Sequence, residues 1–321
     1  MLRSLITKLS QNLSSNSGDC VFVYHPEYNL NLDGHVLPAL KYSKLYELIQ
    51  KDLNLRKLRV YKPPQASIDS LNLVHTAEYL DDLFHLRQTS LTCYSELPLN
   101  SGIVKSVLYA IGGTILATEL TSSSKFVFNI GGGFHHAYPD HAEGFCYLND
   151  AAIATRVYQK KFPDNKILYI DLDVHQGNGN SYAFRDDPNV FTFSMHQENL
   201  YPKKEISDMD IPLREGCRDE EYLWLLRNSL QEISSKFRPD LIYYFAGADT
   251  FEDDTLGEIK LSFDGLKLRD AMVKDFAGET GARTVILTAG GYARNFEDTV
   301  KIHFNTASVF AANTKMSGAG K

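Results

Sequence analysis

The sequence predicts a single α/β domain built on a mainly parallel β-sheet with helices on both faces. Short apolar runs recur along the chain, and stretches with helical periodicity lie between most of them. Nearly continuous apolar strands that alternate with helices are typical of a parallel sheet that is buried on both sides. The 321 residues are enough for one large domain, and they contain no internal repeat and no linker rich in proline and glycine.

Six apolar runs are the candidate strands. They are CVFVYHP (20–26), KFVFNIGGGFHH (125–136), KILYIDLDVH (166–175), VFTFSMH (190–196), LIYYFAGAD (241–249) and RTVILTAGGY (283–292). In five of the six, residues unusual in a core follow at the end of the run. Ligands of parallel α/β folds bind beyond the carboxyl ends of the strands. These strand ends therefore predict where the functional site lies.

Helical periodicity is clearest in three stretches between the candidate strands. They cover residues 101–120, 147–162 and 220–237. We expect residues 1–18 to be a leader or N-terminal extension, 19–312 the domain that holds the functional site and 313–321 a C-terminal tail. The first residues are basic and rich in serine but lack a continuous apolar segment, so a secretory signal is not expected. No run looks long enough to cross a bilayer, so no membrane span is expected either.

Charge and cysteine content narrow the class of protein further. The formal net charge of −7, from 33 basic and 40 acidic residues, argues against direct binding to nucleic acid. The cysteines are scattered without a CxxC pair, which predicts neither a disulfide framework nor a cysteine-rich zinc site. A reducing compartment and a cytoplasmic location are therefore expected. The four cysteines are Cys20, Cys93, Cys146 and Cys217.

The stretch DLDVHQGNG (171–179) carries the strongest chemical signal. In an extended chain, side chains two residues apart point to the same side, so Asp171, Asp173 and His175 would converge. Gly177 and Gly179 disfavour a helix here and favour a turn. Two acids on one side are unfavourable unless a cation or a proton donor offsets their charge. A histidine at the next position on that side favours a metal.

A further acid comes from the end of another run. Asp249 follows the small residues of AGA (246–248), which leave space around it. Asp173, His175 and Asp249 form a set of two carboxylates and one imidazole. Such a set suits zinc with an open coordination position, and ferrous iron, manganese or cobalt could also use it. A divalent cation there would activate water and polarise a carbonyl group.

Two more strand ends supply groups for proton transfer and for charge stabilisation. His135 and His136 follow the triple glycine, where a turn can direct both rings to one site. Asp171 and Asn178 are candidate partners for the rear nitrogens of these rings. Tyr292 ends AGGY, where its hydroxyl could stabilise an oxyanion. The combined set predicts metal-assisted hydrolysis of an amide.

These motifs resemble those of a known family. GGGFHHAYPDHAEGFCYLND (131–150), DLDVHQGNG, GAD (247–249) and AGGY (289–292), in this order, are similar to the zinc-dependent histone deacetylase family, which has the arginase–deacetylase fold. The resemblance covers about residues 19–310. DLDVHQGNG, IGGTILA (111–117) and GADTFEDDTLG (247–257) are most similar to its class IV branch, which includes bacterial lysine deacetylases.

The resemblance implies hydrolysis of an N-ε-acyl-lysine amide, in a protein or peptide substrate, by a zinc-bound water. His136 would be the general base and acid, with Asn178 behind it. His135, held by Asp171, would act electrostatically, and Tyr292 would polarise the acyl carbonyl. The zinc ligands would be Asp173, His175 and Asp249. The walls of an acyl-lysine tunnel would be Gly133, Phe145, Tyr201 and Leu256.

The family also holds a structural monovalent cation, usually potassium. The resemblance implies that the side chains of Asp171 and Ser194 bind it. Main-chain oxygens would complete the site, from Asp171, Asp173, His175 and Met195.

The sequence departs from the family pattern in three places. Asn178 stands where some deacetylases have an aspartate, so the basicity of His136 is expected to be lower. HVLP (35–38) stands where class IV members usually have HPFD. Residues 86–102 have no clear equivalent, and we expect them to form part of the rim and to bear on substrate choice.

Three alternative functions remain open. An arginase-like ureohydrolase would need further acids for a second metal, but Gln176 and Gly177 follow His175. An amidohydrolase for acetylated polyamines or other small acylated amines fits the acidic balance, although no acidic gate can be assigned. A catalytically inactive acyl-lysine binding module would be expected to lack a ligand, the histidine pair or the tyrosine. Acyl length, native metal and oligomeric state are left undetermined.

Overall fold

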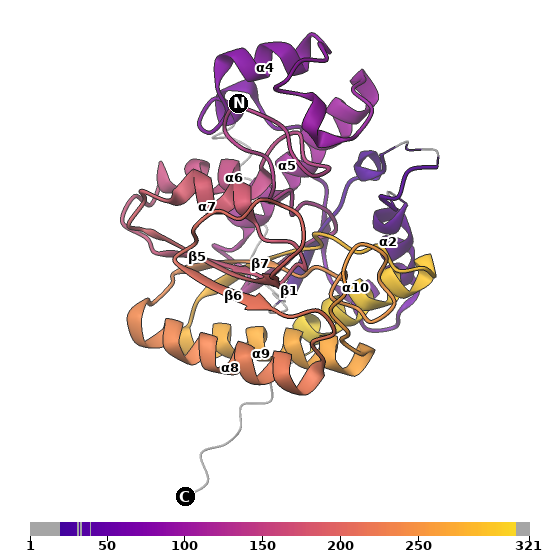
Figure 1. The fold of residues 1–321 in the computed structure, drawn as a ribbon, viewed down its shortest axis with the longest axis vertical. Helices are drawn as coiled ribbons and strands as arrows, with labels where there is room; N and C mark the ends of the chain where they lie inside the picture. The colour runs from indigo at the N-terminus through magenta and orange to yellow at the C-terminus, as the bar shows by residue number, and fades with distance from the viewer. Residues whose placement is uncertain (1–19, 31, 33, 39, 313–321) are drawn as a thin grey trace, which may run out of the picture.

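The computed structural model describes residues 20–312 except 31, 33 and 39. A single eight-stranded sheet has the order β2-β1-β3-β8-β7-β4-β5-β6, and every neighbouring pair of strands is parallel (Figure 1). The expected α/β class is confirmed. The strands are β1 (Cys20–Val23), β2 (Val60–Tyr61), β3 (Phe126–Asn129), β4 (Ile167–Asp171), β5 (Val190–Gln197), β6 (Met209–Leu213), β7 (Leu241–Phe245) and β8 (Arg283–Leu287). The expected leader and tail lie outside the described residues.

All six expected strands are present, and most end before the polar residues that were expected to follow them. The strands β2 and β6 were not anticipated. β2 has only two residues, and β6 contains Pro212, which is tolerated because β6 is an edge strand. Both edge strands are less buried than the central ones.

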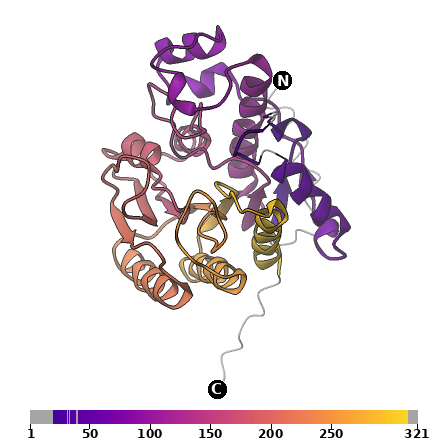
Figure 2. The ribbon, with the colours of Figure 1, turned by 45° about the vertical axis from the view of Figure 1, so that its right-hand side comes forward.

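Helices cover both faces of the sheet (Figures 1 and 2). On one face lie α2 (Lys41–Lys51), α8 (Asp219–Lys236), α9 (Phe263–Thr280) and α10 (Phe296–Ala311). On the other lie α5 (Ser101–Leu120), α6 (Asp150–Gln159) and α7 (Asn178–Phe184), with α3 (Ile68–Leu71) and α4 (Ala77–Phe84) beyond them. Three short 3₁₀ helices are η1 (Pro26–Tyr28), η2 (Leu55–Lys57) and η3 (Cys93–Ser95).

The three expected helices are α5, α6 and α8. Helix α6 begins later than expected because the side chain of Asn149 accepts a hydrogen bond from the Ala152 N–H, at 2.9 Å, and so caps the helix. Helix α8 has three acids in its first turn and Lys236 in its last, as the helix dipole favours.

Helix α5 corrects one expectation from the sequence. Its length and its mean hydropathy of 1.4 would allow it to cross a membrane, so a sufficiently long apolar run does exist. In this fold, however, 67% of the apolar window is buried, and the helix packs against α6 and β3. It therefore has the character of a core helix. The cytoplasmic location stays a prediction.

Alternating side chains along each central strand fill two separate cores. In β4, Leu168 and Ile170 belong to the core under α8, α9 and α10, whereas Ile167 and Tyr169 belong to the core under α5 and α6. All four are essentially buried. Because the central strands β3, β8, β7 and β4 are adjacent and parallel, the loops after them lie along the same edge of the sheet.

Candidate active site

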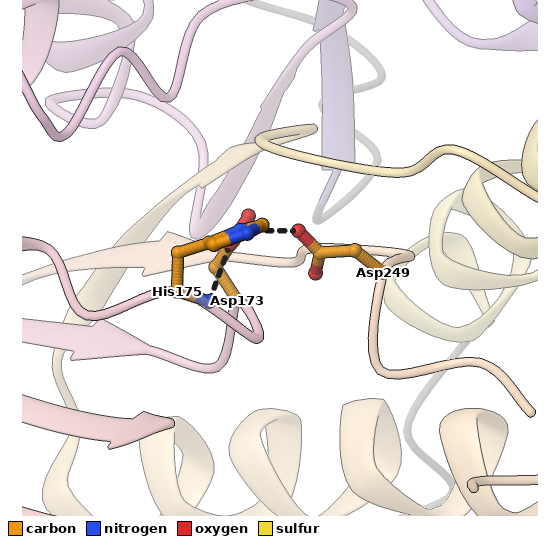
Figure 3. Close-up of side chains that lie close together, drawn as sticks. All are labelled: Asp173, His175 and Asp249. Carbon is orange, nitrogen blue, oxygen red and sulfur yellow. Dashed lines mark hydrogen bonds and ion pairs between the residues drawn. The ribbon is translucent and has the colours of Figure 1, made fainter. Parts of the chain in front are cut away.

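Two neighbouring loops bring together the expected metal ligands. Asp173 and His175 follow β4, and Asp249 follows β7, which pairs with β4 (Figure 3). One ligand atom from each residue lies within 4.8 Å of the others. His175 Nδ1 is 3.1 Å from Asp173 Oδ1 and 3.4 Å from Asp249 Oδ2. All three residues are buried.

The local backbone differs from the extended strand that was expected. β4 ends at Asp171, and residues 173–175 form a bend. The bend keeps Asp173 and His175 together but turns Asp171 toward His135. The glycines were expected to oppose a helix, yet α7 begins at Asn178, directly after Gly177. Gly179 is needed for a close approach, since a Cβ there would lie 2.5 Å from the main-chain oxygen of Ala137.

The electrostatics of the cluster suit a cation. Burial and the charge of Asp173 raise the pKa of Asp249 to about 8. Burial also acts to raise the pKa of Asp173, but His135 and His175 outweigh it and hold that pKa well below its usual range. Apart from the longer contact to His175, Asp249 Oδ2 has no hydrogen-bond partner among the described residues. Two adjacent buried carboxylates with an unsatisfied oxygen are what a divalent cation would neutralise.

A buried arginine beneath the cluster joins the two ligand loops. Arg269 Nη1 donates to the Gly247 oxygen at 2.6 Å, with a longer contact of 3.4 Å to the Leu172 oxygen. Its charge is balanced by Asp270, which also accepts from Thr306 at 2.6 Å. Arg269 is fully buried. The guanidinium therefore fixes the backbone beside both acidic ligands.

The two histidines after β3 have opposite environments. His135 Nδ1 donates to Asp171 Oδ2 at 2.8 Å. Burial acts against its charge, but Asp171 and Asp173 outweigh burial and raise the pKa of His135 to about 9. Burial, together with His135 and His175, lowers the pKa of His136 well below its usual value. At neutral pH the pair is thus one imidazolium beside one neutral ring.

The loop after β8 carries Tyr292. The Tyr292 N–H donates to Asp254 Oδ2 at 2.7 Å. Two residues earlier, the Gly290 N–H donates to Asp173 Oδ2 at 2.8 Å. Burial, then Asp173 and Asp249, raise the pKa of the Tyr292 phenol well above its usual value. The phenol therefore keeps its proton and can donate a hydrogen bond.

A cavity connects these groups. Its lining includes His135, His136, Asp173, His175 and Tyr292, together with Leu37, Tyr42, Gly132, Gly133, Phe134, Gly144, Phe145, Cys146, Ala289 and Gly290. Phe145 adopts a left-handed backbone with φ of 62°, and its ring lies 6.0 Å from that of Tyr292. Gly133 has φ of 88°, and a Cβ there would lie 2.7 Å from the Ala289 Cα. Only glycine accommodates this approach.

Two expected tunnel residues lie outside the lining of the cavity. Tyr201 is 44% exposed, but its ring is 5.6 Å from that of His136, which puts it at the rim. Leu256 is half-buried, and its N–H donates to Asp254, the residue that also binds the Tyr292 N–H. Leu256 therefore lies in the loop that supports Tyr292.

The segment without a clear family equivalent contacts the cavity wall. The N–H groups of residues 142, 144 and 145 donate to the oxygens of Leu91, Tyr94 and Ser95 at 2.8, 3.1 and 2.9 Å. These hydrogen bonds stabilise the left-handed backbone of Phe145. From HVLP, the His35 ring lies 5.1 Å from the Phe145 ring.

The groups expected at the potassium site lie on neighbouring strands. Asp171 of β4 is the register partner of Ser194 of β5, and both residues are buried, as is Met195. The carboxylate of Asp171 also binds His135 and the Asp173 N–H, at 2.8 and 3.2 Å. The cation assignment stays a prediction.

Several supporting residues were missed by the sequence reasoning. Buried Lys41 donates to the Ala289 oxygen at 2.5 Å, and burial lowers its pKa to about 8, although nearby acids oppose the shift. Asp150 accepts from the N–H groups of Gly133 and Phe134 at 3.1 and 2.8 Å, which fixes the glycine turn. The motif YLND could have indicated Asp150. No local pattern indicated Lys41.

The fold and the site together define a parallel α/β protein whose strand-end loops place an Asp-His-Asp set beside a cavity lined by a histidine pair and a tyrosine. The family model for the histone deacetylase domain matches residues 35–307. The chain therefore belongs to the histone deacetylase family, as the motifs predicted, and is a hydrolase of the deacetylase type.

Three curated relatives are similar to the chain over most of its length. The chain is 39% identical over 287 residues to an uncharacterized protein of Picosynechococcus sp., covering 88% of this chain and 95% of that protein. It is 32% identical to histone deacetylase 2 of Arabidopsis thaliana, covering 85% and 74%. It is 27% identical to the acetoin utilization protein AcuC of Bacillus subtilis, covering 85% and 78%.

Proposed function

We propose that the chain hydrolyses the amide of N-ε-acyl-lysine in a protein or peptide, with a divalent cation, zinc in the first instance, held by Asp173, His175 and Asp249. The observation that carries the proposal is the placement of this buried ligand set beside the cavity lined by His136, whose low pKa keeps it neutral, and by the protonated Tyr292. A cation held there would polarise the amide carbonyl and lower the pKa of water.

His136 is the general base and acid in this proposal. Its low pKa keeps the ring neutral, so that it can accept a proton and later return it to the amine that leaves. His135 stays charged against Asp171 and stabilises negative charge nearby. Tyr292 keeps its proton and donates a hydrogen bond from its hydroxyl to the developing oxyanion.

The substrate class is supported by the shape and chemistry of the entrance. Phe145 and Gly133 line the cavity, and Tyr201 stands at the rim, so aromatic rings flank the way to the ligand set. Such walls suit the alkyl stem of a lysine side chain. We also infer that Asp171 and Ser194, as register partners, contribute to a structural potassium site with Met195. The class IV assignment rests on the sequence motifs.

A matched substrate panel tests the function. Acetyl-lysine peptide, myristoyl-lysine peptide and acetylated polyamine are each incubated with the zinc-loaded protein, with and without a chelator. Release of the amine from a lysine peptide, lost with chelator and restored by zinc, is the expected result. Turnover of acetylated polyamine alone would move the substrate to small amines. Absence of turnover on all three, with zinc bound, would contradict the proposal.

A further inference from the structure

Asn178 lies behind His136, and hydrogen bonds define the orientation of its side-chain amide. The amide nitrogen donates to Glu143 Oε1 and to Tyr138 Oη, both at 3.1 Å. The Tyr138 hydroxyl donates its own proton to Glu205 at 3.1 Å, so its oxygen is free to accept. Both amide hydrogens are therefore used, and the amide oxygen faces His136 Nδ1 at 2.7 Å.

This orientation determines which nitrogen of His136 carries the proton. An amide oxygen can only accept, so the hydrogen of the neutral ring is on Nδ1 and Nε2 is left unprotonated. If the amide of Asn178 were rotated by half a turn, its oxygen would face the carboxylate of Glu143. Two acceptors at that distance repel each other, so Glu143 selects the observed orientation.

Glu143 is itself held in place. Its main chain exchanges hydrogen bonds with Cys146, at 3.0 and 2.9 Å. The carboxylate oxygen that binds Asn178 also accepts from the Tyr201 hydroxyl at 3.1 Å. The side chain is only 18% exposed, so water competes weakly for these bonds. The carboxylate of Glu143 thus contacts the side-chain amide of Asn178 on the side away from His136.

We propose that Glu143 is a positioning residue of the hydrolytic site: through Asn178 it fixes the tautomer and the orientation of His136. The inference rests on the proposed function, because it assigns a task within the same site. It also explains how Asn178 can orient His136 at a position where some deacetylases have an aspartate. Asn178 passes the orienting effect of a carboxylate to the histidine, although it has no charge of its own.

Two substitutions and their combination test this assignment. Glu143→Ala removes the charged acceptor of the amide nitrogen and leaves only the Tyr138 hydroxyl, which can also donate, so kcat should fall about 10- to 100-fold while KM changes less. Asn178→Asp alone should also lower kcat, because it sets two carboxylates side by side. In the Glu143→Ala background, Asn178→Asp should instead raise kcat severalfold, since either carboxylate oxygen can accept from His136.

This reversal of sign is the decisive result. A purely structural role for Glu143 would make Asn178→Asp harmful in both backgrounds, and that outcome, or wild-type kcat in Glu143→Ala, would overturn the inference. Glu215→Ala is the matched control, because it makes the same substitution at an exposed side chain between β6 and α8. It should keep the wild-type kcat.

A spectroscopic measurement decides the inference without turnover. In protein labelled with ¹⁵N-histidine, the signal of His136, assigned by its loss in His136→Ala, should report the Nδ1–H tautomer in wild type. Glu143→Ala, or Glu143→Gln if the alanine variant does not fold, should mix the two tautomers. An Nε2–H tautomer in wild type would overturn the inference. Correct tautomers in a protein that hydrolyses no substrate would instead contradict the proposed function.

Discussion

Arg269 Nη1 lies 2.6 Å from the main-chain oxygen of Gly247, and this contact ties helix α9 to the loop that carries Asp249. Replacement by Met should lower the free energy of unfolding by about 3–5 kcal/mol, because it leaves the buried Asp270 without its counter-ion. Zinc affinity should fall about 10- to 100-fold, since the ligand loops lose their support. Chemical denaturation and competition with a chelator measure the two effects.

A double variant distinguishes the ion pair between Arg269 and Asp270 from the hydrogen bonds by which Arg269 holds the ligand loops. Arg269→Met with Asp270→Asn removes both charges, so part of the lost stability should return while zinc affinity stays low. Full recovery of zinc affinity in the double variant would show that the arginine does not position the loops.

Gly290 provides a test of the metal site that leaves every ligand in place. An added Cβ would lie 2.6 Å from Asp173 Oδ2 and closer still to Asp249 Oδ2. Gly290→Ala should therefore lower zinc affinity at least about tenfold. The matched control is Gly278→Ala in α9, where a Cβ meets open space and helix propensity should add up to about 1 kcal/mol of stability. Metal content by mass spectrometry distinguishes them, and equal zinc content would argue against the assigned site.

His136→Ala should reduce the rate of hydrolysis at least about a hundredfold, the usual scale for loss of a general acid–base group. Zinc content should stay normal, because His136 is outside the ligand set. His85→Ala, at a side chain that is 63% exposed, is the control. Steady-state kinetics on an acyl-lysine peptide give the comparison. Near-normal turnover in His136→Ala would remove this residue from the mechanism.

Tyr292→Phe should lower kcat about 100- to 1000-fold, the scale of a lost oxyanion donor. The ring and its packing on Phe145 are kept, so substrate binding should change little. Tyr61→Phe makes the same chemical change at a half-buried ring of the edge strand β2 and should have no effect on kcat. A Tyr292→Phe variant that changes KM alone would show that the hydroxyl acts in binding rather than in the transition state.

A histidine away from the catalytic groups predicts sensitivity to acid. Burial lowers the pKa of His75 to about 4, and its Nε2 accepts from the Asn149 N–H at 3.1 Å. Between pH 6.5 and about 4, His75 is protonated in the unfolded chain but not in the native state. The free energy of unfolding therefore falls as the pH falls through this window. At about 1.4 kcal/mol per pKa unit, the loss is roughly 3 kcal/mol.

His75→Gln keeps an acceptor near Asn149 but cannot titrate. Urea denaturation at pH 7 and pH 4.5 should therefore show a smaller drop in stability for the variant than for wild type. The same drop in both proteins would assign the acid sensitivity to other groups.

The sequence alone determined the class of fold and predicted the residues of the candidate site. Six apolar runs predicted six strands because burial on both faces of a parallel sheet leaves a local signature. The site motifs followed the strand ends because that is where parallel strands present their loops. Helices α9 and α10 were not assigned, although Ser262 and Gly281 cap the two ends of α9 and could have indicated it.

Only the tertiary structure decided how the site residues are supported. Arg269, Lys41 and Glu143 act on loops that are distant in the sequence, through hydrogen bonds to main-chain oxygens or to a side-chain amide. Such contacts leave no periodic pattern, because any residue supplies a main-chain oxygen. The hydrogen bond between Asp171 and His135 likewise joins two strand ends that are distant in the sequence. The local sequence thus predicted the candidate reacting groups, and long-range packing determined the orientation and the charge of their side chains.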